Sequence, residues 1–286
     1  MTITITTSNV NGIRAAKRKG IEDWAGKHAP DVWCIQEVRA PQDDVDSIFD
    51  EFGFEYATAG KIEAPANLHA MNEVCRVKGR AGVGLLTDLE VLDKRYGLPG
   101  LSEDVDSGRW IETDVKTPEG YAITVASVYV HAGNTDYPTK MEQKYRFLDT
   151  MLKRMGALRD EAAHGGKQAV LCGDFNIAHT PLDIKNAKAN EKHAGFLPEE
   201  RAYVDKWLDE YEFVDVMRSL AGDIQGPYTW WSQRGRAFDN NVGWRIDYQF
   251  ATPELAETAR GFVIDKAPTY ELRWSAHAPL TITYDV

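Results

Sequence analysis

The sequence predicts an α/β fold, formed as a single domain over residues 1–286. Strand-like and helix-like segments alternate from one end of the chain to the other, which is typical of this class. Two segments, 121–130 and 167–176, are almost continuously apolar, as strands covered on both faces should be. No tract rich in Pro, Gly or Ser separates one part of the chain from another.

The alternation of Thr with Ile in residues 2–10 is a clear strand signal, because β-branched side chains suit a pleated, half-buried surface. Apolar residues recur at helical spacing in residues 139–163, which predicts one long helix. In chain order, the predicted strands are 2–10, 31–38, 81–88, 109–115, 121–130, 167–176, 244–252 and 279–286.

The composition is that of an ordinary soluble globular protein, with 43% hydrophobic and 27% charged residues. No apolar run approaches the roughly 20 residues needed to span a bilayer, so no membrane partner is expected. The first residues alternate like a strand and lack the basic start and apolar block of a signal peptide. The three cysteines are widely spaced and form no CxxC, which predicts reduced thiols and a cytoplasmic protein.

The net charge of −11, taken alone, argues against a nucleic-acid partner. Binding depends on the local surface rather than on the total, however, and basic residues cluster in residues 14–20, 76–80 and 232–238. Each cluster is compatible with a solvated surface turn or with contacts to phosphate groups. The charge pattern therefore leaves a nucleic-acid partner open.

Polar side chains stand repeatedly where a predicted strand ends, or just before one begins. Because α/β folds use such positions to assemble a site from distant segments, we expect these side chains to converge. They are Asn9, Glu37, Tyr129, Asp174, Asn176, Asp247 and His277. At the rim of an apolar layer, the Glu37 carboxylate either meets solvent or holds a hard divalent cation such as Mg²⁺.

The segment 171–179, LCGDFNIAH, carries the most informative pattern. Gly173 allows a tight turn after the strand, and the two-residue period places Asp174 and Asn176 on the same side. A carboxylate can orient or deprotonate a water molecule, while an uncharged amide can hold an oxygen atom near a phosphate. The alternative is an Asx turn that only closes the strand.

Asp247 lies within an apolar predicted strand, where a charge is costly unless it is paired. His277 is the natural partner. A carboxylate bonded to one imidazole nitrogen raises the pKa of the ring and leaves the other nitrogen free to donate to an anionic oxygen. The alternative partner for Asp247 is Arg245 or another arginine.

Trp230, Trp231 and Trp244 lie in loop-like segments rich in Asn, Gly and Arg. Aromatic rings beside arginines suit stacking on nucleic acid, or else they form a cluster within a folded loop. The second interpretation is favoured for Trp231. The sequence contains no P-loop, GxGxxG or HExxH motif, so none of the sites that these define is predicted.

Taken together, the motifs resemble those of the exonuclease III family of apurinic/apyrimidinic (AP) endonucleases, within the endonuclease/exonuclease/phosphatase superfamily. The likeness covers essentially the whole chain, in the family's order and approximate spacing. The motifs are NVNGIRA, IQEV, AGVGLL, GDFNIAH, DIKNAKAN, AGFLPEER, YTWWS, VGWRIDY and HAPL. GDFN with a late His-Pro is shared by the wider superfamily, whereas AGFLPEER and GWRIDY favour the AP-endonuclease branch.

The resemblance implies a four-layer α/β sandwich, with two packed mixed β-sheets flanked by helices and the site at one edge. It implies that Glu37 and Asn11 bind Mg²⁺, with Mn²⁺ as an alternative. The implied catalytic residues are Asp174 and Asn176 at the attacking water, Asn9 and Tyr129 at the scissile phosphate, and the phosphate-polarising pair Asp247 and His277. The implied DNA contacts are Arg14, Asn186, Asn190, Trp230, Arg234 and Trp244.

By the same resemblance, the activity is Mg²⁺-dependent hydrolysis of the phosphodiester on the 5′ side of an abasic site in duplex DNA, as in base excision repair. 3′→5′ exonuclease and 3′-phosphatase or phosphodiesterase side activities are expected, on abasic sites or blocked 3′ ends. A monomer is expected. The alternatives are an enzyme that mainly processes 3′ ends, a variant weakened in metal binding and activity, and a DNA-binding relative without activity.

The chain departs from the family pattern at a few positions. The family usually carries Ser-Asp-His-Ala-Pro here, so Ala276 replaces an aspartate that lies near the metal. Arg80 and Ala81 stand where Tyr-Ser is common, and His193 stands where Asn is common. Loss of the carboxylate at position 276 is expected to weaken metal affinity while leaving the phosphate-polarising pair intact.

Overall fold

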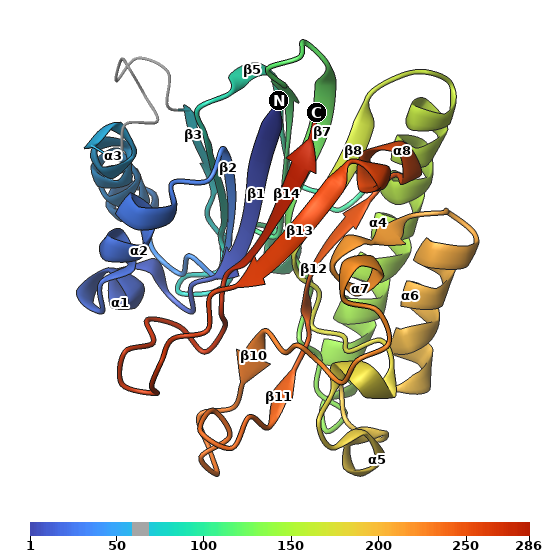
Figure 1. The fold of residues 1–286 in the computed structure, drawn as a ribbon. Helices are drawn as coiled ribbons and strands as arrows, with labels where there is room; N and C mark the ends of the chain where they lie inside the picture. The colour runs from blue at the N-terminus through green and yellow to red at the C-terminus, as the bar shows by residue number, and fades with distance from the viewer. Residues whose placement is uncertain (59–68) are drawn as a thin grey trace.

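The computed structural model of the protein describes residues 1–58 and 69–286. Two six-stranded mixed sheets pack face to face, and helices cover the outer face of each sheet (Figure 1). This four-layer arrangement confirms the fold class predicted from the sequence. None of the helices in the described ranges has the length and apolar character that a membrane span requires.

In the first sheet, β1 lies at the centre between β14 and β2. β1 pairs antiparallel with β14 and parallel with β2, so Thr7 lies opposite Leu280. Across this sheet the order is β13 (Ala259–Ile264), β14 (Leu280–Asp285), β1 (Thr2–Asn9), β2 (Val32–Gln36), β4 (Val83–Thr87) and β3 (His69–Glu73).

The second sheet is built around the parallel pair β7 and β8, whose sequences are the most continuously apolar. Alternate residues face opposite layers: Val125 and Val170 pack between the two sheets, whereas Val128 and Leu171 pack under the outer helices. Burial on both faces explains why apolar residues run without a break here. The order is β5 (Glu90–Tyr96), β6 (Trp110–Lys116), β7 (Ala122–Tyr129), β8 (Gln168–Asp174), β12 (Asp247–Ala251) and β9 (Val214–Asp215).

Helices bury aromatic side chains against both sheets. On the first sheet, Trp24 of α2 and Phe52 of α3 contact Trp33 of β2. On the second sheet, Trp207 of α6 contacts Phe250 of β12. The helices are α1 (Ile13–Arg18), α2 (Ile21–His28), α3 (Gln42–Thr58), α4 (Pro138–Ala163), α5 (Ala187–Asn190), α6 (Pro198–Asp209), α7 (Val216–Ala221) and α8 (Pro253–Glu257).

A two-stranded hairpin of β10 (Trp230–Trp231) and β11 (Gly243–Trp244) projects from one edge of the sandwich, at the bottom of Figure 1. Trp230 lies opposite Trp244 in this hairpin. Trp231 is buried against Phe238, as the cluster interpretation predicted for it.

The helix predicted over residues 139–163 is confirmed by α4, which begins at Pro138. The strands β3, β5 and β13 are absent from the prediction. All three lie at sheet edges, and β5 carries mostly exposed, charged side chains. Edge strands bury little apolar surface and are often charged, so their sequence gives a weak strand signal.

Candidate active site

The polar residues predicted at strand ends meet at the edge of the sandwich that carries the β10–β11 hairpin. Asn9 ends β1, Glu37 directly follows β2, Tyr129 ends β7 and Asp174 ends β8. Both parallel pairs, β1–β2 and β7–β8, end at this edge, so each sheet contributes two side chains. The expected convergence is therefore observed for these four residues.

Asp247 begins its strand, whereas the sequence pattern placed it at a strand end. β12 runs antiparallel to β8, so its first residue lies level with the last residue of β8, Asp174. The reversal of direction brings Asp247 to the same edge as the other polar side chains.

His277 lies before β14 and is held in place by contacts with neighbouring segments. The Ser275 hydroxyl donates to the Asn9 carbonyl at 2.6 Å and accepts from the His277 backbone N–H at 3.2 Å. A backbone bridge also pairs His277 with Trp230 of the hairpin. These contacts fix the imidazole at the site edge.

The imidazole of His277 is bonded to Asp247, as predicted. Its Nδ1 lies 2.9 Å from Oδ2 and 3.1 Å from Oδ1 of Asp247. Arg245, the alternative partner, pairs instead with Asp183 and Asp215, at 2.7 Å in each case. The Asp247–His277 interpretation is therefore correct and the Arg245 alternative is wrong.

The electrostatic surroundings of His277 favour its charged form. Burial alone would lower the pKa of the imidazole, but the Asp247 carboxylate, and after it Asp174 and Glu37, raise that pKa to about 9. The ring is therefore an imidazolium at neutral pH. Its Nε2 lies 3.8 Å from Oδ2 of Asp174, so the two side chains face each other across a short gap.

Asp174 is fully buried among other acidic groups. Burial is the main cause that raises the pKa of its carboxyl to about 7; the charges of Asp247 and Glu37 act in the same direction, while His277 opposes them. The carboxylate accepts hydrogen bonds from the Asn9 side-chain amide at 2.8 Å and from the Asn176 backbone at 2.9 Å. A carboxylate with a pKa near neutrality is suited to accept a proton from water.

Glu37 anchors a second group of contacts at the pocket. The Tyr129 hydroxyl donates to Oε1 of Glu37, and the Arg39 guanidinium pairs with Oε2. Arg39 also donates to Oδ1 of Asn11 at 2.9 Å. Burial and the Glu37 charge raise the pKa of Tyr129 well above its ordinary value, so this hydroxyl stays protonated.

The donor atoms present fit a hard divalent cation. Glu37 and Asn11 both line the pocket and offer a carboxylate and an amide oxygen, the ligand types that Mg²⁺ prefers. Asp174, Asp247 and His277 form a further acidic group, with ligand atoms within 4.8 Å of one another. Ala276 lines the same pocket and adds no donor.

Four residues that line this pocket have an unusual backbone conformation. Asn11, Glu37, Arg39 and Asn176 all have positive φ, at 50°, 55°, 51° and 51°. Residues other than glycine rarely adopt this conformation, and it persists where the surrounding structure fixes it for function.

The site opens into a pocket of about 480 Å³ with an aromatic wall. Trp230 and Trp244 meet edge to face at 5.9 Å on that wall. Gly195 faces Trp244 at φ +93°, and a Cβ there would lie 3.0 Å from the ring and 3.2 Å from the Asn176 carbonyl. A side chain at position 195 would therefore crowd the wall.

The other predicted DNA contacts lie outside this pocket. Arg14 pairs with Asp44 at 3.1 Å, and the Asn190 amide donates to the Asn186 carbonyl within α5 at 2.8 Å. Arg234 is exposed in the β10–β11 loop, next to the pocket residue Gln233.

Two cationic residues that contact the site, Arg39 and Lys144, were not predicted from the sequence. Lys144, on the buried face of α4, donates to the Asn176 carbonyl at 2.9 Å and pairs with Glu200 at 2.5 Å, while Glu200 accepts from the Gly195 backbone. A lysine interrupting the apolar stripe of the predicted helix was the available signal, since buried lysines need partners.

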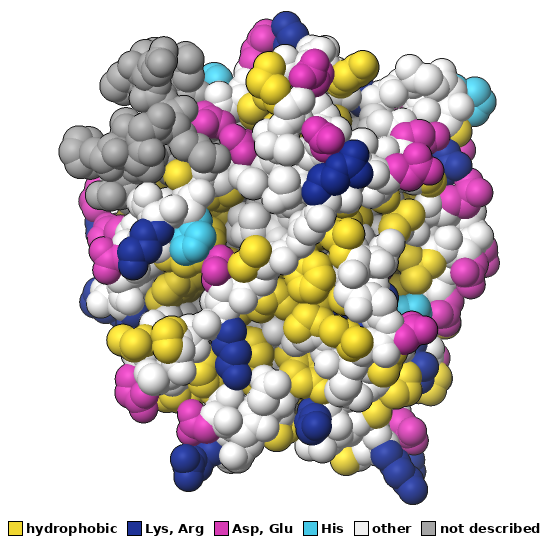
Figure 2. All heavy atoms as spheres, viewed as in Figure 1, with side chains coloured by type: hydrophobic (Ala, Val, Ile, Leu, Met, Phe, Trp, Pro, Cys, Tyr) yellow, Lys and Arg dark blue, Asp and Glu magenta, His cyan; other side chains and the backbone are white. Residues whose placement is uncertain are grey.

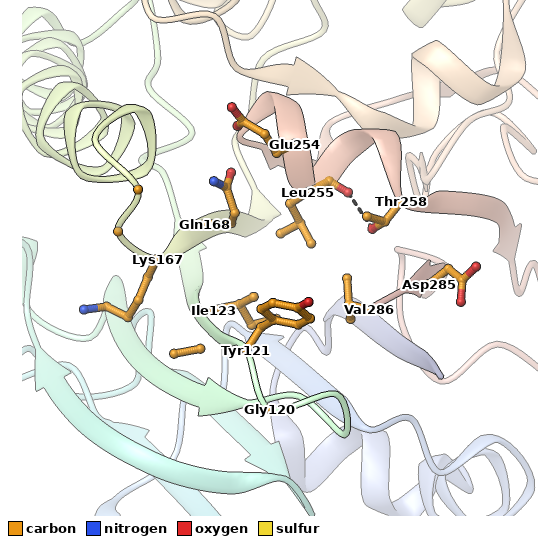
Figure 3. Close-up of a pocket in the computed structure, with 13 residues that line it drawn as sticks. Gly120, Tyr121, Ile123, Lys167, Gln168, Glu254, Leu255, Thr258, Asp285 and Val286 are labelled. Carbon is orange, nitrogen blue, oxygen red and sulfur yellow. Dashed lines mark hydrogen bonds between the residues drawn. The ribbon is translucent and has the colours of Figure 1, made fainter.

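A larger pocket, of about 690 Å³, lies at the opposite ends of β7 and β8 (Figure 3). Tyr121, Ile123 and Leu255 line it, and the charged ends of Lys167 and Glu254 point away from its centre. It lacks the converging polar groups of the smaller pocket, so the smaller pocket is the candidate active site.

Comparisons with known proteins agree with this geometry. A model described as the Endonuclease/Exonuclease/phosphatase family matches residues 6–277. An exodeoxyribonuclease of Bacillus subtilis (strain 168) is 29% identical over 279 residues, which cover 97% of this chain and 98% of that protein. The DNA repair nuclease APEX1 of Danio rerio is 34% identical over 247 residues, covering 85% of this chain and 71% of that protein.

Solved structures with the same fold include nucleases. An AP endonuclease from Archaeoglobus fulgidus superposes with a TM-score of 0.81 at 27% identity, covering 99% of this chain and all of that one. A 3′–5′ exonuclease from Neisseria meningitidis superposes with a TM-score of 0.82 at 25% identity and the same coverage. The chain belongs to the endonuclease/exonuclease/phosphatase family, as a hydrolytic nuclease of the exonuclease III-type AP endonuclease group.

Proposed function

We propose that the protein hydrolyses the phosphodiester bond on the 5′ side of an abasic site in duplex DNA, with Mg²⁺ as its cofactor. The observation that carries this proposal is the facing pair of Asp174 and His277, 3.8 Å apart in a pocket walled by two tryptophans. One side chain is poised as a base and the other as a cation. Relatives named as a DNA repair nuclease and an AP endonuclease support the choice of substrate.

In this mechanism Asp174 accepts a proton from the water that attacks phosphorus. Asn9 and the Asn176 backbone orient its carboxylate through the two hydrogen bonds described above. The Oδ1 of Asn9 also accepts from the Asn11 backbone at 2.9 Å, which fixes the orientation of the amide. Asn9 therefore positions Asp174 with one amide hydrogen, and its second amide hydrogen can serve the phosphate contact that the sequence resemblance implies.

His277 stabilises the negative charge that grows on the phosphate oxygens. Asp247 accepts from Nδ1, which leaves the Nε2 proton directed into the pocket. A fixed donor in a buried site stabilises a developing charge more than a mobile water does. Glu37 and Asn11 would hold Mg²⁺, which when bound neutralises charge on the same phosphate. Tyr129 remains a proton donor, because its hydroxyl does not ionise near neutrality.

The pocket supports selection of a site that has lost its base. Trp230 and Trp244 leave a confined volume beside the reactive groups, which suits a bare sugar better than a nucleotide. DNA binding is compatible with the net charge of −11, because Lys and Arg side chains protrude at the lower edge of Figure 2, where the hairpin lies. Affinity should therefore fall steeply with added salt.

A gel assay on end-labelled duplexes tests the proposal. We expect Mg²⁺-dependent cleavage 5′ to a single abasic site, little cleavage of the matched intact duplex, and none in EDTA. A duplex ending in a 3′-phosphate is the second substrate, because the rival function is the processing of blocked 3′ ends. Faster reaction at the 3′-phosphate than at the abasic site would favour a 3′-end-processing enzyme instead.

The raised pKa values of Asp174 and His277 predict a bell-shaped pH profile for the incision rate. Asp174, with its pKa near 7, gains its basic form as pH rises, while His277 loses its proton above about 9. Single-turnover rates should therefore rise through pH 7 and fall through pH 9. In Asp247→Asn the alkaline limb should move to lower pH, since the main group that raises the His277 pKa loses its charge. A rate independent of pH across this window would contradict the assignment.

Restoring a carboxylate at position 276 should strengthen metal binding. Ala276→Asp adds a charged oxygen ligand to the pocket that holds Glu37 and Asn11, so the Mg²⁺ midpoint for incision should fall several-fold and the rate should rise. Ala194→Asp, which adds the same charge at another position lining the pocket, is the matched control. An unchanged midpoint and rate in Ala276→Asp would show that position 276 does not influence the cation.

A further inference from the structure

Arg39 places a guanidinium on the two residues proposed to hold the cation. Its Nη2 pairs with Oε2 of Glu37, and its Nη1 donates to Oδ1 of Asn11 at 2.9 Å. The remaining oxygen of Glu37 accepts from the Tyr129 hydroxyl. One positive charge thus already bridges both candidate ligands.

The backbone fixes this contact. The Val38 and Arg39 N–H groups donate to the Gly82 and Ala81 carbonyls, at 3.0 and 2.8 Å. Glu37 and Arg39 stand two residues apart and both have positive φ, so their side chains are held together in the pocket lining. The local chain path therefore brings the two side chains within reach of each other.

The two members of the pair differ in their freedom to move. The Glu37 side chain is 9% exposed, whereas that of Arg39 is 41% exposed. Arg39 also lines a neighbouring groove of about 480 Å³ together with Arg14, Arg76 and Lys78. The guanidinium can therefore leave Glu37 for this groove, while the carboxylate stays in place.

Position 276 adds no side-chain oxygen to the two candidate metal ligands, Glu37 and Asn11. Ala276 lines this pocket without adding an oxygen, so the pair Glu37 and Asn11 has no third ligand from that position. A guanidinium is a diffuse cation with a fork of donors that fits a carboxylate and an adjacent amide oxygen. A divalent cation that binds these oxygens therefore competes with the guanidinium for them.

We infer that Arg39 is an internal competitor of the divalent cation, which occupies Glu37 and Asn11 until the metal displaces it toward the neighbouring groove. This inference rests on the proposed function, since it takes Glu37 and Asn11 as the metal ligands. The apparent metal affinity is the intrinsic affinity multiplied by the fraction of molecules in which the Arg39 pair is open.

Mn²⁺ binding to the full chain, followed by electron paramagnetic resonance of the free ion without DNA, tests the inference. Arg39→Met should bind Mn²⁺ about 3- to 10-fold more tightly than the unchanged protein, because a competing ion pair is removed. Arg39→Gln, which keeps a polar group beside Asn11, should show the same direction. Arg39→Lys keeps the charge and should stay close to the unchanged protein.

Arg80→Met is the matched control, because it removes the same charge from another residue that lines the neighbouring groove but does not line the pocket of Glu37 and Asn11. Its Mn²⁺ affinity should stay unchanged. Equal or weaker binding in both Arg39→Met and Arg39→Gln, with folding verified by thermal unfolding, would overturn the role of Arg39. If Glu37→Gln binds Mn²⁺ as tightly as the unchanged protein, the metal assignment itself fails. Loss of binding in Glu37→Gln upholds that assignment whatever Arg39 does.

Discussion

Replacing His277 by alanine should lower the single-turnover rate of incision about 100- to 1,000-fold, the usual effect of removing one fixed donor to a developing oxyanion. Asp247 holds the imidazolium through Nδ1, so the substitution removes the Nε2 proton that is fixed in the pocket. DNA affinity, measured by fluorescence anisotropy on an abasic duplex in Ca²⁺, should change little, because most of the binding energy comes from other phosphates.

His179→Ala provides the control for this substitution. His179 pairs with Asp205 at 2.7 Å, outside the pocket residues, so the same change there should leave the rate near its original value. Full activity in His277→Ala would overturn its assignment as the phosphate-stabilising cation.

Replacing Asp174 by asparagine should lower the incision rate by roughly 100- to 10,000-fold, the range found when a general base is removed. Asparagine has nearly the same size and keeps an oxygen acceptor, so the fold should survive. The amide cannot accept the proton of the attacking water, and the acid limb of the pH profile should disappear with the carboxyl group. Asp149→Asn, on the exposed side of α4, is the matched control.

Thermal unfolding provides an independent measurement on the same variant. The folded pKa of Asp174, about 7, lies above its ordinary value of 3.8, so this group costs stability as pH rises between those values. Asp174→Asn removes that cost and should raise the melting temperature at pH 8 relative to the unchanged protein, with a smaller gain near pH 4. A lower melting temperature at pH 8 would contradict the unfavourable burial of this charge.

Much of the site could be predicted because several of its residues stand out from their immediate sequence neighbours. A charge within an apolar strand demands a partner, which pointed from Asp247 to His277, and the two-residue period placed Asp174 beside Asn176. The direction of β12 relative to β8 gives no such signal in the local sequence. Strand direction depends on which strands become neighbours, so the placement of Asp247 at a strand start could not be read from its own segment.

The missed residues depend on contacts between distant segments. Arg39 looks like an ordinary solvated arginine in the sequence, and only the fold shows that Glu37 and Asn11 share its guanidinium. The partners of Lys144, the Asn176 carbonyl and Glu200, lie 32 and 56 residues further along the chain. The edge strands β3 and β5 were missed because few of their side chains are both apolar and buried.

The pairing of β1 with β14 bears on when the protein can first act. Thr7 of β1 is translated well before its partner Leu280, so this pairing must wait until β14 has been made. Pairings between such remote positions form slowly, because a long loop must close first. A growing chain would therefore carry Asn9, Glu37 and Asp174 without His277 beside them, and nuclease activity should appear only after synthesis has passed β14.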